Sequence, residues 1–235
     1  LHSFPTRRSS DLTMGSWKKA MQEVGFNGFV EAGLGGDMTA ASEAAEWVEA
    51  YKEGEKKVTS CCPGFVNMVR LHFPEMADKI STTISPMCAV SRLIKAQDPD
   101  AVTVFVGPCV AKKLEASRRT VRSEVDFVIT FEELAGMFDA KEIDFNTYDK
   151  EEELNDAFGA GRGYAVASGV AGAIKACIDE YYPGTEVKID HVEGLAECKK
   201  MLLQAKAGKK KGYLIEGMGC PGGCVAGAGT NIPAD

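Results

Sequence analysis

The apolar positions of the chain follow two spacings, one typical of amphipathic helices and one typical of buried strands. Trp17, Met21 and Val24 recur at helical spacing, whereas residues 101–106 form a continuous apolar run rich in β-branched side chains. We predict helices at 16–24, 40–51, 66–71, 86–96, 132–138, 171–182 and 195–207. We predict strands at 101–106, 125–131, 164–167, 187–192 and 213–216.

Several helix ends have sequence signals of their own. Asp37 and Thr39 are candidate caps for the helix at 40–51, because their side-chain oxygens can accept the first free N–H groups of a helix. Pro86 suits the first turn of the helix that follows Ser85. Strands and helices that alternate in this way predict an α/β fold with helices on both faces of its sheets.

The first twelve residues differ from the rest of the chain. Residues 7–10 interrupt any helical or strand period. We interpret residues 1–12 as a non-native, adapter-derived tail, and residues 13–235 as one domain built from two lobes.

Composition narrows the class of protein. With 45% hydrophobic residues the chain can bury a core, and its net charge of -7 argues against nucleic-acid binding, which needs a clustered basic surface. No apolar stretch approaches the roughly 20 residues of a membrane span, and no signal peptide is recognisable. We therefore predict a cytoplasmic protein, in which eight cysteines stay reduced and favour metal or redox chemistry.

Three segments carry cysteine among glycine, proline and charged residues. They are 59–65 with Cys61 and Cys62, 107–115 with Cys109, and 216–224 with Cys220 and Cys224. In two of them the cysteine follows a predicted strand, and strand ends are where α/β folds build their sites. An iron-sulfur cube needs four converging thiolates, and flanking glycines allow close approach and leave backbone amides free to point at sulfur.

Two plainer interpretations compete with the cluster. Cys88, Cys177 and Cys198 stand alone in apolar helical settings and are more simply small buried hydrophobic residues. A structural zinc site usually pairs its ligands two to four residues apart at both ends, whereas only one such pair occurs in these segments.

Taken together and in this order, the three segments resemble the signature motifs of the FeFe-hydrogenase (iron-only hydrogenase) active-site domain, over most of the chain from about Ser16. The resemblance implies two lobes of mainly parallel or mixed β-sheet flanked by helices, with the cofactor in the cleft between them. That cofactor, the H-cluster, is a 4Fe-4S cube bridged to a two-iron unit with CO, CN and dithiolate amine ligands. By resemblance, the cube ligands are Cys62, Cys109, Cys220 and Cys224, and Cys224 forms the bridge.

The resemblance also implies roles for the residues around the cofactor. Lys112 would pair with a cyanide, Met218 would pack beside the two-iron unit, and Cys61 would donate protons to the bridging amine. The proton relay behind Cys61 would run through Ser81, Glu43 and Glu46. Glu43 and Glu46 stand three apart on a predicted helix and so share one face, although without the resemblance an ordinary solvated face is the simpler interpretation.

The implied function is the reversible reduction of protons to H2, with electrons from ferredoxin or a partner subunit and with dedicated maturation enzymes. Phe65 stands where the best-known members have tryptophan, Gly107 where they have methionine, and Ala50 where they often carry a basic residue at the outer end of the relay. Residues 81–87 resemble a less studied branch of the family more closely. The chain also stops soon after Cys224, so we expect the domain to be incomplete at its ends. A hydrogen sensor, a non-catalytic iron-sulfur relative and a plain electron-transfer module remain as alternatives.

Overall fold

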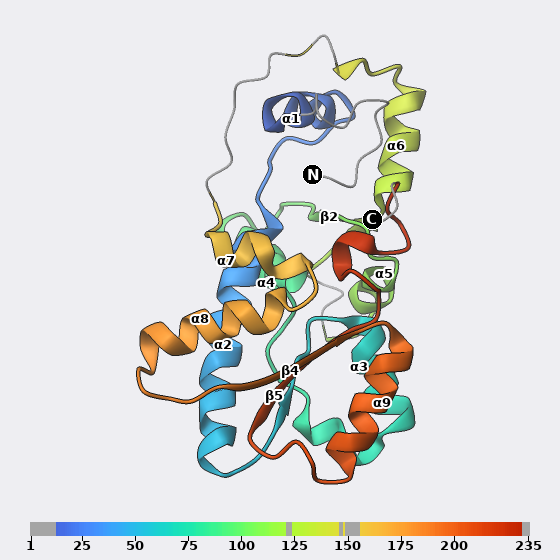
Figure 1. Ribbon diagram of the computed structural model, residues 1–235. Helices are drawn as coiled ribbons and strands as arrows, with labels where there is room; N and C mark the ends of the chain where they lie inside the picture. The colour runs from blue at the N-terminus through green and yellow to red at the C-terminus, as the bar shows by residue number, and fades with distance from the viewer. Residues whose placement is uncertain (1–12, 121–123, 146–147, 149–155, 232–235) are drawn as a thin grey trace.

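A parallel three-stranded sheet forms the centre of the first lobe (Figure 1). The structure is a computed structural model, and it describes residues 13–120, 124–145, 148 and 156–231. The strand order is β1-β5-β4, with bounds β1 (Lys57–Val58), β4 (Lys188–Glu193) and β5 (Tyr213–Met218). The central strand β5 is buried on both faces, because Leu214 packs into one core cluster and Ile215 into the other.

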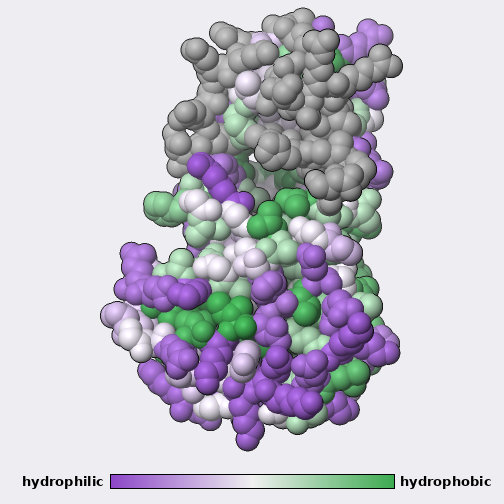
Figure 2. All heavy atoms as spheres, in the orientation of Figure 1, coloured by the Kyte–Doolittle hydropathy of each residue, from purple (hydrophilic) through white to green (hydrophobic). Residues whose placement is uncertain are grey.

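Helices cover both faces of this sheet. On the Leu214 face lie α2 (Ala32–Lys52) and α8 (Gly169–Tyr181), and on the Ile215 face lie α3 (Pro63–His72), the short η2 (Pro74–Lys79) and α9 (Leu195–Lys206). Figure 2 shows mostly polar side chains on the viewed face of this lobe, with apolar ones gathered around α8 and β4.

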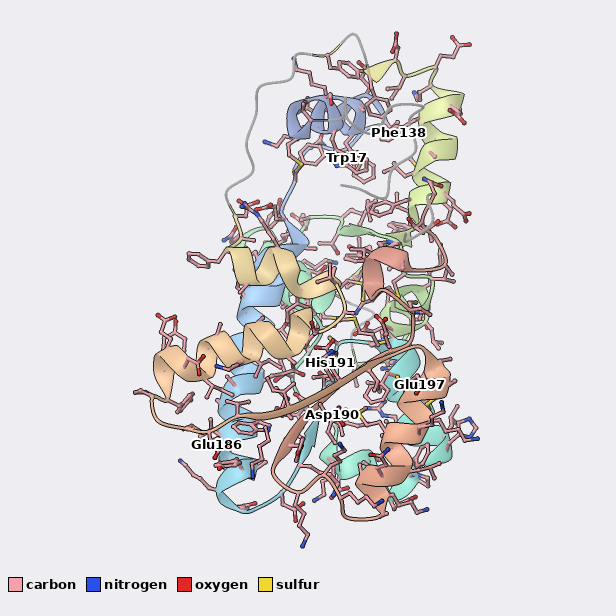
Figure 3. The ribbon with its side chains drawn as sticks, viewed as in Figure 1. Trp17, Phe138, Glu186, Asp190, His191 and Glu197 are labelled. Carbon is pink, nitrogen blue, oxygen red and sulfur yellow. The ribbon has the colours of Figure 1, made fainter. Side chains whose placement is uncertain are left out.

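The second lobe is built on a parallel pair of strands. The pair is β2 (Val104–Val106) and β3 (Phe127–Ile129), and the surrounding helices are α1 (Met14–Glu23), α4 (Pro86–Gln97), α5 (Ala111–Ala116) and α6 (Phe131–Ala140). One core cluster joins α4 and α5 to the strands, and another joins α1 to α6. In the latter, the rings of Trp17 and Phe138 meet edge to face with centroids 5.9 Å apart (Figure 3).

Three short elements complete the described part of the fold. They are α7 (Gly159–Arg162), η4 (Gly163–Ala165) and η5 (Cys224–Ala226), and two of them, α7 and η4, pack against α2. A Cβ atom on Gly35 of α2 would lie 2.2 Å from the carbonyl oxygen of Pro86, and one on Gly161 would lie 2.1 Å from that of Gly33. Only glycine therefore lets α4 and α7 approach α2 this closely.

The predicted α/β fold with helix-flanked parallel sheets is confirmed, and two local predictions are wrong. Residues 164–167 are not a strand, because η4 occupies their start and only Val166 forms an isolated bridge, to Gly223. The helix predicted at 40–51 begins instead at Ala32. Asp37 does not cap it, because its carboxylate accepts the N–H of Phe158, and the hydroxyl of Thr39 donates to the carbonyl of Ile84.

The predicted tail at 1–12 lies outside the described residues. Within the parts of the chain that the structure describes, no helix is both long and apolar enough to cross a bilayer.

Candidate functional site

The four predicted cluster ligands lie at the ends of elements from both lobes. Cys62 immediately precedes α3, Cys109 lies between β2 and α5, Cys220 follows β5 and Cys224 begins η5. Burial raises the pKa of Cys109, Cys220 and Cys224, and the neighbouring thiols of the set raise it further. Each of the six possible pairs of these thiols appears among the causes of the three pKa shifts. The structure therefore places the four thiols near one another.

Backbone amides face three of these sulfurs. The N–H of Gly219 donates to Cys62 Sγ at 3.3 Å, and Cys109 and Cys220 each accept backbone N–H groups as well. Such donors favour the thiolate, which is the form that binds a metal. The predicted orientation of a glycine amide towards sulfur is therefore confirmed at Gly219.

Glycines after Cys220 allow the last segment to pack tightly on the second one. A Cβ atom on Gly227 would lie 2.4 Å from the carbonyl oxygen of Pro108, and the N–H of Gly229 donates to the same oxygen at 2.8 Å. Gly223 has a φ of +86°, a conformation that other residues rarely adopt. This packing holds Cys224 beside Cys109.

The cysteine side chains are not gathered around a single ion. Among the described residues, no three His, Cys, Asp or Glu side chains lie close enough together to hold one metal ion. Thiolates around a single zinc lie about 4 Å from one another, whereas a four-iron cube holds its thiolates further apart. The described geometry therefore does not support a zinc site, and four cysteine thiols are the donor set that a 4Fe-4S cube takes.

The remaining cysteines lie in packed surroundings. Cys88 and Cys198 are fully buried, and Cys177 is partly buried on α8. The thiol of Cys198 donates to the carbonyl of Met218 at 3.5 Å. These positions fit the structural interpretation of the three residues.

Lys112 is a buried cation directly behind Cys61. Its Nζ lies 2.6 Å from a carboxylate oxygen of Glu115 and donates to the carbonyl oxygen of Cys61 at 3.0 Å. Burial alone would lower the pKa of Lys112, but the Glu115 carboxylate raises it above its ordinary value. Met218 is also buried, in the same core cluster as Cys61.

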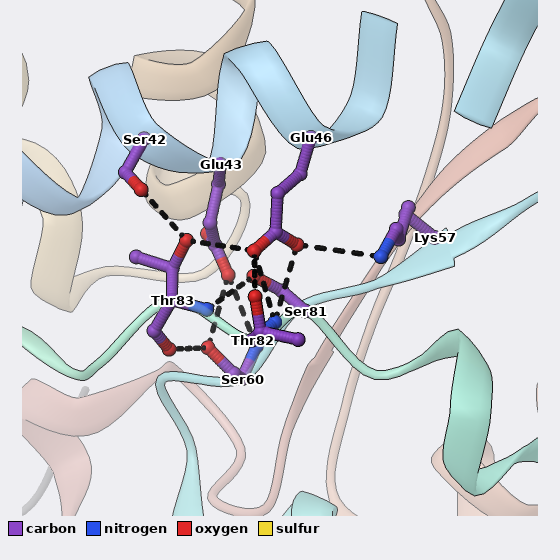
Figure 4. A network of polar contacts seen from close by, with 8 residues as sticks. All are labelled: Ser42, Glu43, Glu46, Lys57, Ser60, Ser81, Thr82 and Thr83. Carbon is purple, nitrogen blue, oxygen red and sulfur yellow. Dashed lines mark hydrogen bonds and ion pairs between the residues drawn. The ribbon is translucent and has the colours of Figure 1, made fainter. Parts of the chain in front are cut away.

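Glu43 is the inner carboxyl group of the predicted relay. Only 2% of it is exposed, and its Oε1 accepts the backbone N–H of Ser60 at 3.1 Å and the Ser60 hydroxyl at 3.2 Å (Figure 4). Burial raises the pKa of Glu43 to about 7 despite these hydrogen bonds. Glu43 can therefore exist in either protonation state near neutral pH.

Glu46 is the outer carboxyl group, and its pKa is shifted in the opposite direction to that of Glu43. Burial works to raise its pKa, but hydrogen bonds from Thr82 and Ser81 and the charge of Lys57 outweigh it, so the pKa of Glu46 is lowered. Lys57 Nζ lies 3.4 Å from Glu46 Oε2 (Figure 4). Ser81 lowers the pKa of both Glu43 and Glu46, so the structure places the three relay candidates close to one another.

Sequence reasoning missed three contributors to this site. Ser60 supplies two donors to Glu43, and Lys57 supplies a cation that the resemblance places at position 50, where this chain has alanine. The third is Tyr164, whose hydroxyl donates to Glu43 Oε2 at 3.4 Å. Only the departure at Ala50 gave a signal in the sequence, since it invited a search for another cation.

Comparison with known proteins decides the family. The family described as "Iron only hydrogenase large subunit, C-terminal domain" matches residues 3–228. The chain belongs to the iron-only hydrogenase family. Its relatives include the periplasmic Fe hydrogenase large subunit of Nitratidesulfovibrio vulgaris, 30% identical over 267 residues that cover 94% of this chain and 63% of that protein.

Not all matches to this hydrogenase-family chain are hydrogenases. The cytosolic Fe-S cluster assembly factor NAR1 of Kluyveromyces lactis is 39% identical over 89 residues, which cover 38% of this chain and 19% of that protein. A variant of the FeFe-hydrogenase HydA1 from Chlamydomonas reinhardtii matches in structure with a TM-score of 0.76 and 21% identity, over 96% of this chain and 75% of that one. The latter likeness shows the fold. The chain spans between 44% and 63% of the length of its curated hydrogenase relatives.

Proposed function

We propose that this chain is the cofactor-binding part of an iron-only hydrogenase that catalyses the reversible reduction of protons to H2. One observation supports the catalytic interpretation above all: hydrogen bonds through Thr83 and Ser60 connect the outer carboxylate Glu46 to Glu43, and Ser81 lies close enough to lower the pKa of both, beside the four converging thiols. A protein that only stores or passes on a cluster has no use for such a path.

The four thiols offer a place for the cofactor. Cys62, Cys109, Cys220 and Cys224 would hold a 4Fe-4S cube, and Cys224 would bridge it to a two-iron unit with CO, CN and dithiolate amine ligands. When bound, this H-cluster would accept electrons from the partner and provide the site at which protons become H2.

Two buried residues would shape the pocket for the two-iron unit. Lys112 has three N–H donors, of which Glu115 and the Cys61 carbonyl take two, so one is left for an anionic ligand such as cyanide. Met218 would supply a soft, apolar wall.

The relay residues would deliver protons one at a time. Ionised Glu46 would take a proton from solvent, Ser81 would pass it on, and Glu43 would hold it near neutral pH because the pKa of Glu43 is about 7. The Cys61 thiol, whose pKa burial raises well above the ordinary value, would keep its proton until an acceptor stronger than water is close. Electrons would come from ferredoxin or an electron-transfer subunit, and maturation enzymes would supply the two-iron unit.

A second candidate is a non-catalytic role in iron-sulfur assembly. The match to NAR1 favours it, because that factor shares 39% identity over 89 residues. A hydrogen sensor would share the fold and cofactor as well.

One experiment separates these functions. The chain is reconstituted with iron and sulfide, a synthetic two-iron complex is added, and hydrogen evolution from reduced methyl viologen is measured. We expect hydrogen from the wild-type protein and a loss on the order of 100-fold in Cys61→Ala, with unchanged cluster spectra. Cys177→Ala serves as the control for loss of a thiol elsewhere.

The two outcomes against the proposal are distinct. A fully loaded wild-type protein that evolves no hydrogen would favour the assembly role. Full turnover in Cys61→Ala would remove that thiol from the proton route.

A further inference from the structure

A cavity of about 370 Å³ lies beside α3, and none of the four converging thiols lines it. Its wall comes from α3, η2, the segment at 80–85, α4 and the residues in and after α5. Four of its lining residues are drawn in Figure 4, namely Ser60, Ser81, Thr82 and Thr83. Pockets for small molecules span roughly 300–1,000 Å³, so this cavity has room for a small ligand.

Two arginines line this cavity, and neither is paired with a carboxylate among the residues that the structure describes. Arg70 is an exposed residue of α3, and Arg118 is half-buried just after α5. Arg118 Nη2 donates to Oδ1 of Asn67 at 2.8 Å, which leaves the other N–H groups of the guanidinium for a ligand. By contrast, Arg92 is bound to the carboxylate of Glu124. A chain with a net charge of -7 thus has two cations without a counter-ion at one cavity.

The negative charge at the cavity is already compensated. Glu115 is the only carboxylate among the described lining residues. One of its oxygens lies 2.6 Å from Lys112 Nζ, and the other accepts the Cys88 thiol at 3.8 Å. The charges of Arg70 and Arg118 therefore dominate the cavity, and an anion is the ligand that they favour.

The rest of the wall indicates what kind of anion fits. Val66, Ile80 and Ile84 supply apolar surface beside the hydroxyl groups. An inorganic anion would leave this surface against water, whereas a carboxylate on a short hydrocarbon chain would cover it. A carboxylate also matches the planar fork of a guanidinium with two parallel hydrogen bonds.

We propose that this cavity is a binding site for a small organic acid. The carboxylate of the ligand lies between Arg70 and Arg118, and its hydrocarbon part lies against Val66, Ile80 and Ile84. The inference does not rest on the proposed function, because binding requires neither a cluster nor turnover.

Butyrate is the probe, with butyramide and phosphate as matched comparisons. Butyramide has nearly the same shape without the charge, and phosphate has the charge without the hydrocarbon chain. Saturation-transfer NMR follows butyrate on the full chain of 235 residues, and displacement of butyrate measures the other two. We expect butyrate to bind with a Kd on the order of 1 mM, given its few atoms, and each comparison to bind roughly tenfold more weakly.

Two variants each remove one cation from the cavity. Arg70→Gln and Arg118→Gln should each weaken butyrate binding roughly tenfold, because each loses charge-assisted hydrogen bonds to the carboxylate. Arg119→Gln is the matched control, since Arg119 is the next residue along the chain, is exposed and does not line the cavity. It should bind butyrate as the wild-type protein does. Circular dichroism shows that each variant is folded, and Arg70→Gln, at an exposed position, tests the site even if Arg118→Gln does not fold.

Several results would overturn the inference. They are a lack of saturable butyrate binding, equal binding of butyrate and butyramide, and wild-type affinity in the two cavity variants. Phosphate that binds as tightly as butyrate would assign the cavity to inorganic oxyanions instead. An equal loss of affinity in Arg119→Gln would assign the effect to net charge.

Discussion

Replacement of Glu43 by glutamine should change how the stability of the fold depends on pH. Glutamine has nearly the same shape, and its carbonyl oxygen can still accept the two hydrogen bonds from Ser60. The substitution removes only the ability to ionise. Any pH-dependent difference between the two proteins therefore reports on the buried carboxyl group.

The expected size follows from linkage. The pKa of Glu43 is raised from an ordinary 4.5 to about 7 in the folded chain. Below pH 4.5 the group is protonated in both folded and unfolded states, and between 4.5 and 7 only the folded state keeps the proton. Since each pH unit in this window is worth about 1.4 kcal/mol, the wild-type protein should lose about 3 kcal/mol relative to Glu43→Gln by pH 7.

Urea unfolding of both proteins at intervals from pH 4 to pH 8 measures this difference. The difference in unfolding free energy should fall across the window and level off above pH 7. Glu49→Gln, at an exposed position of α2, controls for the change in overall charge. A difference that stays constant with pH would refute the assignment of Glu43 as a buried, neutral acid, and the same slope in Glu49→Gln would assign the effect to net charge.

Three further predictions concern other parts of the site. Lys57→Gln should raise the pKa of Glu46 by an amount typical of a partly exposed ion pair, below about 1 kcal/mol, as measured by infrared titration of the carboxylate band. Cys109→Ala should lower iron and acid-labile sulfide after reconstitution, whereas Cys177→Ala should retain both. Gly35→Ala should destabilise the fold by about 3 kcal/mol or more in urea, because its new methyl group would meet a backbone carbonyl of α4 at 2.2 Å; a loss below about 1 kcal/mol would show that α2 and α4 separate easily.

Patterns of residues that are close in sequence were sufficient to predict the strands and the helix that position the candidate site. The apolar run before Cys109 and the strand before Cys220 predicted where those thiols would stand, and the structure has β2 and β5 there. The spacing of Glu43 and Glu46 likewise placed both on one face of α2. These features depend on residues that are close in sequence.

Contacts between distant segments could not be predicted in the same way. Tyr164 and Glu43 are 121 residues apart, and their contact depends on glycines that let η4 approach α2. We predicted a strand at 164–167, although packing of η4 against α2 and α8 decides the conformation there. Asp37 shows the same limit, since its carboxylate binds the backbone of Phe158 rather than the start of its own helix.

The division of the proposed ligands between the two lobes has a consequence for the stability of the protein in the cell. Cys109 comes from the smaller sheet and the other three from around the larger one, so a bound cube would be a cross-link that closes two long loops of chain. Loss of the cube under iron starvation would then lower the thermal stability of the protein and speed its proteolysis, in addition to ending turnover.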